Sequence, residues 1–437
     1  MIFSKVNSAP LKWFMAFVLM SELVHVSINT SPPTSLRLVY IVVYFLFCAS
    51  YVKLIPIFTA INLITERFST IFGEFLPNTL WFHIAILLFG YIQLRHTQNP
   101  AYRGFDRQNW RLLVLFALYV FANTVFYGNI SFLLSITFSI VYLLVLNLTD
   151  DEYIQPLINC IIITMCCSCL ISLYNYDNLV ADYATSSGDT QRLAWKDSNY
   201  LSFFIGIVFL LSAFRYSRTS KSGEKRFYLI VLSIFFICLT LLVSRGAILS
   251  LGIALAFYYK KAIFSPKIVG IAICVGLVFM LALHVGLLDN VIRRFMSEDM
   301  SSGSGRTVIW AAGLGTFLQK DTLIHLFGAG CGAADRMASL SGILFSPHNN
   351  FLQILFDFGA VGLFLFLGWW LLLFINSHTT EKRTLIIFIL VNSMTIVPLY
   401  YVTPIWIIIP LLLVWDERIN HLSSTYKCNF LGADNKQ

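Results

Sequence analysis

Four short polar motifs in this largely apolar sequence contain residues that could do chemistry. One of them is the triplet Ser244-Arg245-Gly246, which lies at the end of an apolar run. An arginine costs roughly 2.5–3.5 kcal/mol at the centre of a membrane helix, so Arg245 needs a compensating role. Its guanidinium is a planar fork that binds phosphate oxygens in pairs. An arginine near the end of a span can also extend to the lipid headgroups. The triplet therefore predicts either an anion site or a snorkelling side chain.

The other three motifs place basic, amide or imidazole side chains directly before apolar runs. They are GDTQRLAWKDSNYLSFF, SSGSGRTVIWAAGLGTF and SPHNNFLQILFDFGAVGLFLF. The residues in them that we single out are Arg192, Lys196, Asn199, Arg306, His348 and Asn349. We expect Arg192, Lys196, Asn199 and Asn349 to contact substrate.

Each of these residues also has an ordinary structural explanation. Histidine is the side-chain type that ordinarily titrates near neutral pH. His348 can therefore act as a general base beside a hydroxyl, but it can equally be a residue at a helix entry. Asn349 or Asn350 could cap the following helix. Arg306 could pair with Glu298 or Asp299 in an exposed loop.

The sequence contains no recognisable metal or cofactor motif. SSGSG lacks the Gly-Lys-Ser/Thr that completes a phosphate-binding P-loop, and the nine cysteines show no zinc spacing. The acidic run Asp150-Asp151-Glu152 falls between two apolar runs, where a solvated turn is expected. We therefore predict an activity that needs neither metal nor cofactor.

Composition sets the class of protein that must position these side chains. The 437 residues are 58% hydrophobic and only 12% charged, whereas soluble domains carry about 25% charged residues. The net charge of +8 lies in short loops between apolar runs, so it does not indicate nucleic-acid binding. We predict an all-α, polytopic helical bundle that forms one integral membrane domain over residues 1–437.

About 12–14 spans are expected, because roughly 20 residues cross a bilayer. The predicted spans are Leu11–Val26, Leu38–Ser50, Thr79–Leu94, Arg111–Phe126, Ile130–Leu146, Tyr153–Tyr174, Tyr200–Phe214, Phe227–Val243, Ala247–Tyr259, Val269–Leu288, Phe351–Ile375, Leu385–Leu399 and Ile405–Trp415. Leu54–Phe75 is either a further span or an interfacial helix, because it is apolar on one side but carries three charged residues.

Three basic segments predict the orientation of these spans. They are RHTQNPAYRGFDRQNWR, RYSRTSKSGEKR and HTTEKR, and the positive-inside rule places all three in the cytoplasm. Because successive spans cross the membrane in opposite directions, Asn175–Ser198 and the large loop Leu288–Asn350 are expected on the external side. Arg245, Arg306 and His348 would face that same side.

Taken together and in this order, the motifs resemble those of the bacterial O-antigen ligase/polymerase family. The resemblance rests on Ser244–Ala247, on Gly305-Arg306 with VIW, on LFGAGCG at Leu326–Gly332 and on HNNFLQILFDFGAVGL, and it covers roughly Arg192 to Leu372. It implies a GT-C-like bundle in the bacterial inner membrane, with a large periplasmic loop between two late spans and with membrane lipid around it.

The same resemblance implies a reaction and roles for three residues. Such enzymes transfer a glycan from undecaprenyl pyrophosphate to a hydroxyl at the periplasmic face, without a metal. Arg245 and Arg306 occupy the positions of the essential arginines, and His348 that of the loop histidine. A chain-length regulator and a flippase are possible partners.

WKDSNYLSFF and FGAGCG look more like polymerases, which extend one lipid-linked repeat with another, than like ligases, which use the lipid A core as the acceptor. A lipid-linked glycan flippase and an inactive assembly scaffold are further alternatives. A flippase should keep charges inside the bundle, whereas here the spans hold almost no ionisable residues and the candidate residues are predicted on one face.

Overall fold

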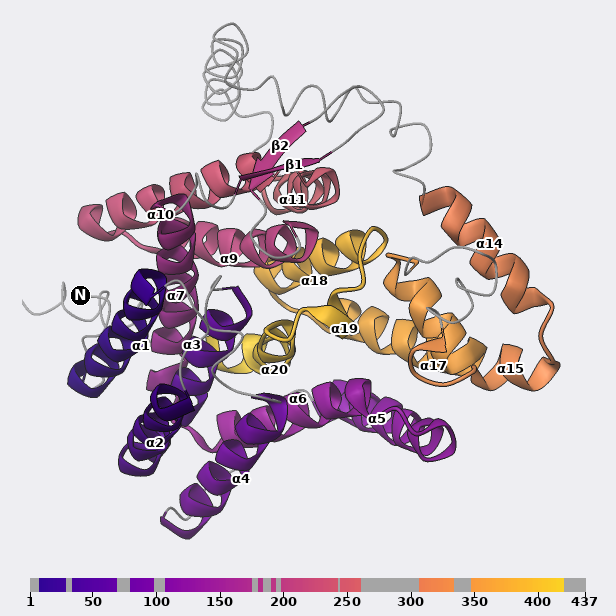
Figure 1. Cartoon of the computed structure of the whole chain (residues 1–437), viewed down its shortest axis with the longest axis horizontal. Helices are drawn as coiled ribbons and strands as arrows, with labels where there is room; N and C mark the ends of the chain where they lie inside the picture. The colour runs from indigo at the N-terminus through magenta and orange to yellow at the C-terminus, as the bar shows by residue number, and fades with distance from the viewer. Residues whose placement is uncertain are drawn as a thin grey trace, which may run out of the picture.

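The computed structural model describes ten stretches of the chain: residues 8–28, 34–68, 79–97, 107–174, 180–183, 190–193, 198–242, 244–260, 306–333 and 347–419. The predicted span Val269–Leu288 and the candidate residue Lys196 lie outside these stretches. What is described is a bundle of helices, which confirms the all-α, multi-pass class (Figure 1).

Six described helices are long and apolar enough to cross a membrane, and each contains or closely matches a predicted span. They are Gln108–Tyr127, Ser131–Leu148, Asp151–Tyr174, Ser198–Arg218, Ser222–Leu242 and Asn350–Ile375. In the labels of Figure 1, these are α5 (Arg107–Tyr127), α6 (Ser131–Leu148), η3 (Asp151–Tyr153) with α7 (Ile154–Tyr174), α9 (Ser198–Arg218), α10 (Ser222–Leu242) and α17 (Asn350–Ile375). The larger expected number of spans remains a prediction.

The remaining apolar runs form helices that are shorter, bent or less apolar. They are α1 (Ser8–Ile28), α2 (Thr34–Ser50), η1 (Val52–Leu54), α3 (Ile55–Phe68), α4 (Thr79–Thr97), α11 (Arg245–Tyr258), α18 (Thr380–Ser393), α19 (Pro398–Tyr401), α20 (Ile405–Val414) and the π-helical turn η5 (Trp415–Ile419). The chain bends by 111° between Arg37–Ser50 and Val52–Thr65, so these two helices count as one broken span or a re-entrant turn. The ambiguous segment Leu54–Phe75 is described as far as Phe68, and its remaining residues lie outside the described stretches.

The segment α20 lies at the centre of the bundle. Its sequence IWIIIPLLLV has no polar face, and all ten residues are buried. A helix that is apolar all round must be surrounded by protein or lipid, and α20 packs against α6 (Figure 1).

The segments predicted to be external contain regular structure of their own. A short antiparallel hairpin pairs β1 (Val180–Tyr183) with β2 (Thr190–Leu193), and it places Ala181 opposite Arg192. Within the large predicted loop, α14 (Arg306–Leu318) and α15 (Thr322–Phe327) are helical and lie at the edge of the bundle beside α17 (Figure 1). The sequence did not predict the hairpin.

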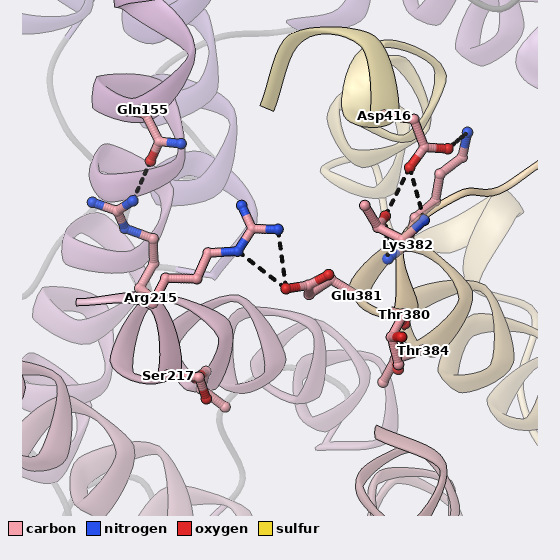
Figure 2. A network of polar contacts seen from close by, with 11 residues as sticks. Gln155, Arg215, Ser217, Thr380, Glu381, Lys382, Thr384 and Asp416 are labelled. Carbon is pink, nitrogen blue, oxygen red and sulfur yellow. Dashed lines mark hydrogen bonds and ion pairs between the residues drawn. The ribbon is translucent and has the colours of Figure 1, made fainter. Parts of the chain in front are cut away.

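Polar contacts involve the described parts of all three basic segments, and Figure 2 shows those around Arg215, Glu381 and Asp416. Arg218 forms an ion pair with Glu381 at 3.0 Å, and Arg215 donates to Gln155. Asn376, at the end of α17, donates to Gln108 at the start of α5 at 3.4 Å. The described parts of the three basic segments therefore share one end, as a common side of the membrane requires.

We call the end of the bundle that holds the basic segments the charged end. There, Asp416 and Arg418 of the π-helical turn η5 bond other segments of the chain, and we call these two residues the C-terminal clasp. Asp416 accepts from the backbone N–H of His378 and from the Lys382 ammonium, at 3.0 and 3.1 Å. Arg418 is 2% exposed; it donates to the carbonyls of Leu146 and Thr149 and pairs with Asp151 at 2.6 Å. The acidic run thus contributes to an ion pair at this end of the bundle.

The helix directions place the polar motifs at the opposite end. α9 and α17 begin at Ser198 and Asn350 and run toward the charged end, while α10 runs away from it, toward the triplet with which α11 begins. A helix of 21 residues is about 30 Å long, which is the thickness of the hydrocarbon core. We call the end of the bundle opposite the charged end, where α9 and α17 begin and α10 ends, the motif end.

Candidate functional site

At the motif end, the structure joins two of the sequence motifs through a hydrogen bond. The Ser244 hydroxyl donates to the side-chain oxygen of Asn199 at 3.2 Å. Ser244 is the N-cap residue of α11, but its side chain does not bond the helix; it reaches across to α9 instead. The predicted substrate contact Asn199 and the predicted anion ligand Arg245 are therefore neighbours, 46 residues apart in sequence.

The start of α11 lies close to the Thr395 side chain. A Cβ atom on Gly246 would lie 2.5 Å from the Thr395 Oγ1, so a larger residue here would require the threonine to shift. Thr395 follows α18, which packs against both α11 and α17. The start of α11 is thus fixed against α9 on one side and against the end of α18 on the other.

The other two motifs are joined in the same manner. Arg306 is the first residue of α14, and the Trp310 indole one turn later donates to the Pro347 carbonyl at 2.5 Å. Pro347 directly precedes His348. The Arg306 motif and the His348 motif therefore meet at the start of α17.

His348 itself has an unusual backbone. Its φ of 46° makes it the only non-glycine residue with positive φ in the described part of the chain. Such a conformation is uncommon outside glycine and persists where surrounding contacts enforce it. Asn349 next to it caps α17, because its side-chain oxygen accepts from the N–H groups of Phe351 and Leu352 at 3.0 and 3.1 Å. The capping alternative for Asn349 is confirmed, and its contact with substrate stays a prediction.

These basic groups sit where helix dipoles disfavour them. Arg245 and Arg306 are first residues of their helices, and His348 lies two residues before α17. A helix N-terminus carries partial positive charge, so a cation there loses about 0.3–1 kcal/mol. An anion gains from the guanidinium and from the N-terminus together. Taken singly, each of the two arginines therefore lies at a position that favours an anion, and binding of phosphate by them together stays a prediction.

The glycine-rich motif Leu326–Gly332 comprises the end of α15 and the loop that follows it, and it contacts both α5 and α17. Three side chains of α5 donate to its carbonyls: Tyr119 and Asn123 to Phe327, each at 3.1 Å, and Tyr127 to Gly328 at 3.1 Å. These three residues were not predicted from the sequence. Their spacing of four residues along an otherwise apolar span could have revealed them as one polar stripe.

The same loop meets α17 at a kink that only glycine permits. Gly359 has φ 67° and ψ −170°, and a Cβ there would lie 2.4 Å from the Leu326 carbonyl carbon. Directly before the kink, the buried Asp357 accepts from the backbone N–H of Gly332 at 3.1 Å. Asp357 was also missed, although a single acid inside an apolar span is a recognisable signal.

We expect Gly359→Ala to destabilise the protein by about 2–6 kcal/mol, through strained backbone and steric overlap. The matched control is Gly368→Ala on the same helix, where an added Cβ meets no atom within 4 Å and should be neutral or stabilising by up to about 1 kcal/mol. Thermal unfolding in detergent measures both variants. Equal midpoints for the two variants would contradict the docking of the loop against the kink.

The structure places the other predicted residues less completely. Arg192 lies on β2, and Lys196 lies outside the described residues. Among the residues that the structure describes, no group of three or more His, Cys, Asp or Glu side chains is arranged to hold a metal ion. Independence from metal stays a prediction.

The fold and the site define a class of protein: a multi-pass helical membrane protein with cationic groups at the starts of helices. In a comparison with protein families, residues 228–367, about a third of the chain, match the model described as O-antigen ligase. The match begins in α10, includes Arg245, Arg306 and His348, and ends within α17. It confirms the resemblance in the motifs and supports glycosyl transfer of the O-antigen ligase type on lipid-linked glycans. Comparisons with curated proteins and with solved structures gave no match.

Proposed function

We propose that this protein polymerises O-antigen or a related surface polysaccharide. It would transfer a glycan from undecaprenyl pyrophosphate to the end sugar of another lipid-linked repeat. The observation that carries the proposal is the position of Arg245, Arg306 and His348 at helix starts within the stretch that matches the family.

The proposed chemistry needs no metal. His348 takes the proton from the acceptor hydroxyl as that oxygen attacks the anomeric carbon of the donor sugar. The bond between this carbon and the pyrophosphate oxygen breaks, and the pyrophosphate leaves on its lipid. Arg245 and Arg306 stabilise the departing negative charge by paired, charge-assisted hydrogen bonds.

The ligase reaction is the alternative, because the matching family is described as O-antigen ligase. It would use the same leaving group and the same three residues, with the lipid A core as the acceptor. The resemblance of WKDSNYLSFF and FGAGCG to polymerases favours the polymerase. A chain-length regulator and a flippase are proposed partners, and a GT-C-like arrangement is the proposed architecture.

Deletion of the gene tests polymerase against ligase. Loss of a polymerase should leave single repeat units on the lipid A core, and loss of a ligase should leave polymer on undecaprenyl pyrophosphate with a bare core. The glycans are read by gel profile and mass spectrometry, with plasmid complementation as the control. An unchanged profile would contradict both reactions.

We further propose that the motif end faces the periplasm and the charged end faces the cytoplasm of a bacterial inner membrane. In a background without native cysteines, an impermeant maleimide applied to intact cells should label Asp321→Cys and spare Ser220→Cys. Both positions are exposed, the first between α14 and α15 and the second between α9 and α10. Disruption of the cells should expose both, which controls for reactivity. The opposite labelling pattern would reverse the orientation.

A further inference from the structure

The segment that carries Arg306 is fastened to α17 at two separate points. The first is the hydrogen bond from the Trp310 indole to the Pro347 carbonyl, at 2.5 Å. Trp310 lies one turn after Arg306, and residues four apart share one face of a helix. This contact therefore joins the face of α14 that carries Arg306 to the residue before His348.

The second point lies 20 residues beyond Trp310, where the glycine-rich loop meets the kink in α17. A regular helix would offer the Phe356 and Asp357 carbonyls to N–H groups four residues later. The non-helical Gly359 interrupts that ladder. The two carbonyls accept instead from the N–H groups of Ala329 and Gly330, each at 3.0 Å.

Asp357 secures this second point with its side chain. It is 0% exposed, and one carboxylate oxygen accepts from the Gly332 N–H and from the Gln353 side-chain amide, each at 3.1 Å. A buried carboxylate is costly to desolvate unless hydrogen bonds compensate it. Removing the acceptor would therefore release the loop and leave two donors without a partner.

We infer that Trp310 and Asp357 are positioning residues that hold Arg306 in a fixed place relative to His348. Neither is assigned a contact with substrate; they act through the backbone of α14 and α17. The inference rests on the proposed function, because it states that these two contacts between α14, the loop and α17 affect the rate of glycosyl transfer. Proton transfer by His348 and charge stabilisation by Arg306 occur in one step, so their relative position must be set before substrate binds.

The test variant is Trp310→Phe, which keeps an aromatic ring and removes only the indole N–H. The matched control is Trp370→Phe on α17, whose buried indole nitrogen has no hydrogen-bond partner among the described residues. Purified full-length protein is assayed with lipid-linked glycan extracted from the deletion strain. We expect kcat to fall about tenfold in Trp310→Phe with KM changed less than about twofold, and about no change in the control.

Double variants separate positioning from general weakening. Because Trp310 acts through Arg306, Trp310→Phe should add little to the loss already caused by Arg306→Lys, whereas its effect should multiply with that of Arg245→Lys. Equal coupling to both arginines, or a Trp310→Phe that behaves like Trp370→Phe, would overturn the inference.

A distance measurement tests the fastening without relying on activity. Spin labels at Leu314 and Phe364, both exposed on α14 and α17, should give a broader distance distribution in Trp310→Phe and in Asp357→Leu than in wild type or Trp370→Phe. A broadened distribution together with an inactive wild-type protein would refute the proposed function and keep the fastening. An unchanged distribution beside an active wild-type protein would refute the fastening alone.

Discussion

Replacement of His348 by alanine should abolish glycosyl transfer while donor binding stays nearly intact. A general base contributes roughly 10²–10⁴-fold to rate, and it acts only when the acceptor hydroxyl attacks. The loss should therefore appear in kcat and not in the affinity for the lipid-linked donor. The measurement is polymer formation and donor binding with purified protein at equal concentration.

The positive φ of His348 calls for a second variant. Alanine at φ 46° is strained, whereas asparagine tolerates this backbone region. His348→Asn keeps the backbone and removes the imidazole, so it should be as inactive as His348→Ala. His378→Ala at the charged end is the control, because only its backbone N–H is used there. An active His348→Asn would show that the backbone, and not the imidazole, is required.

Arg245→Lys should lose about 30-fold or more in rate while the protein still inserts and folds. Truncating one partner of a desolvated charge pair costs about 2–5 kcal/mol, and each 1.36 kcal/mol is tenfold in rate. A lysine keeps the charge but cannot bind two phosphate oxygens in a planar fork. Polymer yield per membrane-inserted protein measures the effect.

Arg218→Lys is the matched control for this substitution. Arg218 pairs with Glu381 at the charged end, where an ammonium can serve nearly as well as a guanidinium, since partly exposed pairs contribute little. Near-normal polymer from Arg245→Lys would favour the snorkelling explanation, in which Arg245 only reaches the headgroups.

The amino-acid sequence predicts the membrane-spanning helices of this protein well because their signal is local. Phe351–Ile375, for example, differs from α17 by a single residue at its start. Capping by Asn349 was also recognisable, because an N-cap bonds N–H groups only two and three residues away. Short elements were harder: the hairpin of β1 and β2 has four-residue strands that lack a strong alternating pattern.

The pairing of the motifs depends on contacts that the local sequence does not encode. Nothing near Ser244 indicates that its hydroxyl would bond Asn199 and leave its own helix uncapped. The bond from Trp310 to Pro347 likewise spans 37 residues. The sequence predicts which side these groups face, and the packing of α9 with α11 and of α14 with the start of α17 determines which of them meet.

Polar side chains buried between the apolar helices were a further feature that the sequence did not predict. Tyr44, fully buried in α2, approaches the Nδ1 atom of His83 in α4 at 3.2 Å and the Thr59 hydroxyl in α3 at 3.3 Å. Isolated polar side chains in apolar runs have little effect on the average composition of those runs. Only the packing of three helices shows them as one network.

The C-terminal clasp sets an order for the biogenesis of the protein. Arg418 meets Asp151 across 267 residues, and Asp416 meets Lys382 across 34. Both contacts can therefore form only after η5 has been synthesised, when Arg418 can bond the carbonyls at the end of α6 and Asp416 can pair with the ammonium of Lys382, which is 1% exposed. We expect a chain that ends before η5 to leave this buried ammonium without its carboxylate, and a buried charge without its partner is strongly destabilising.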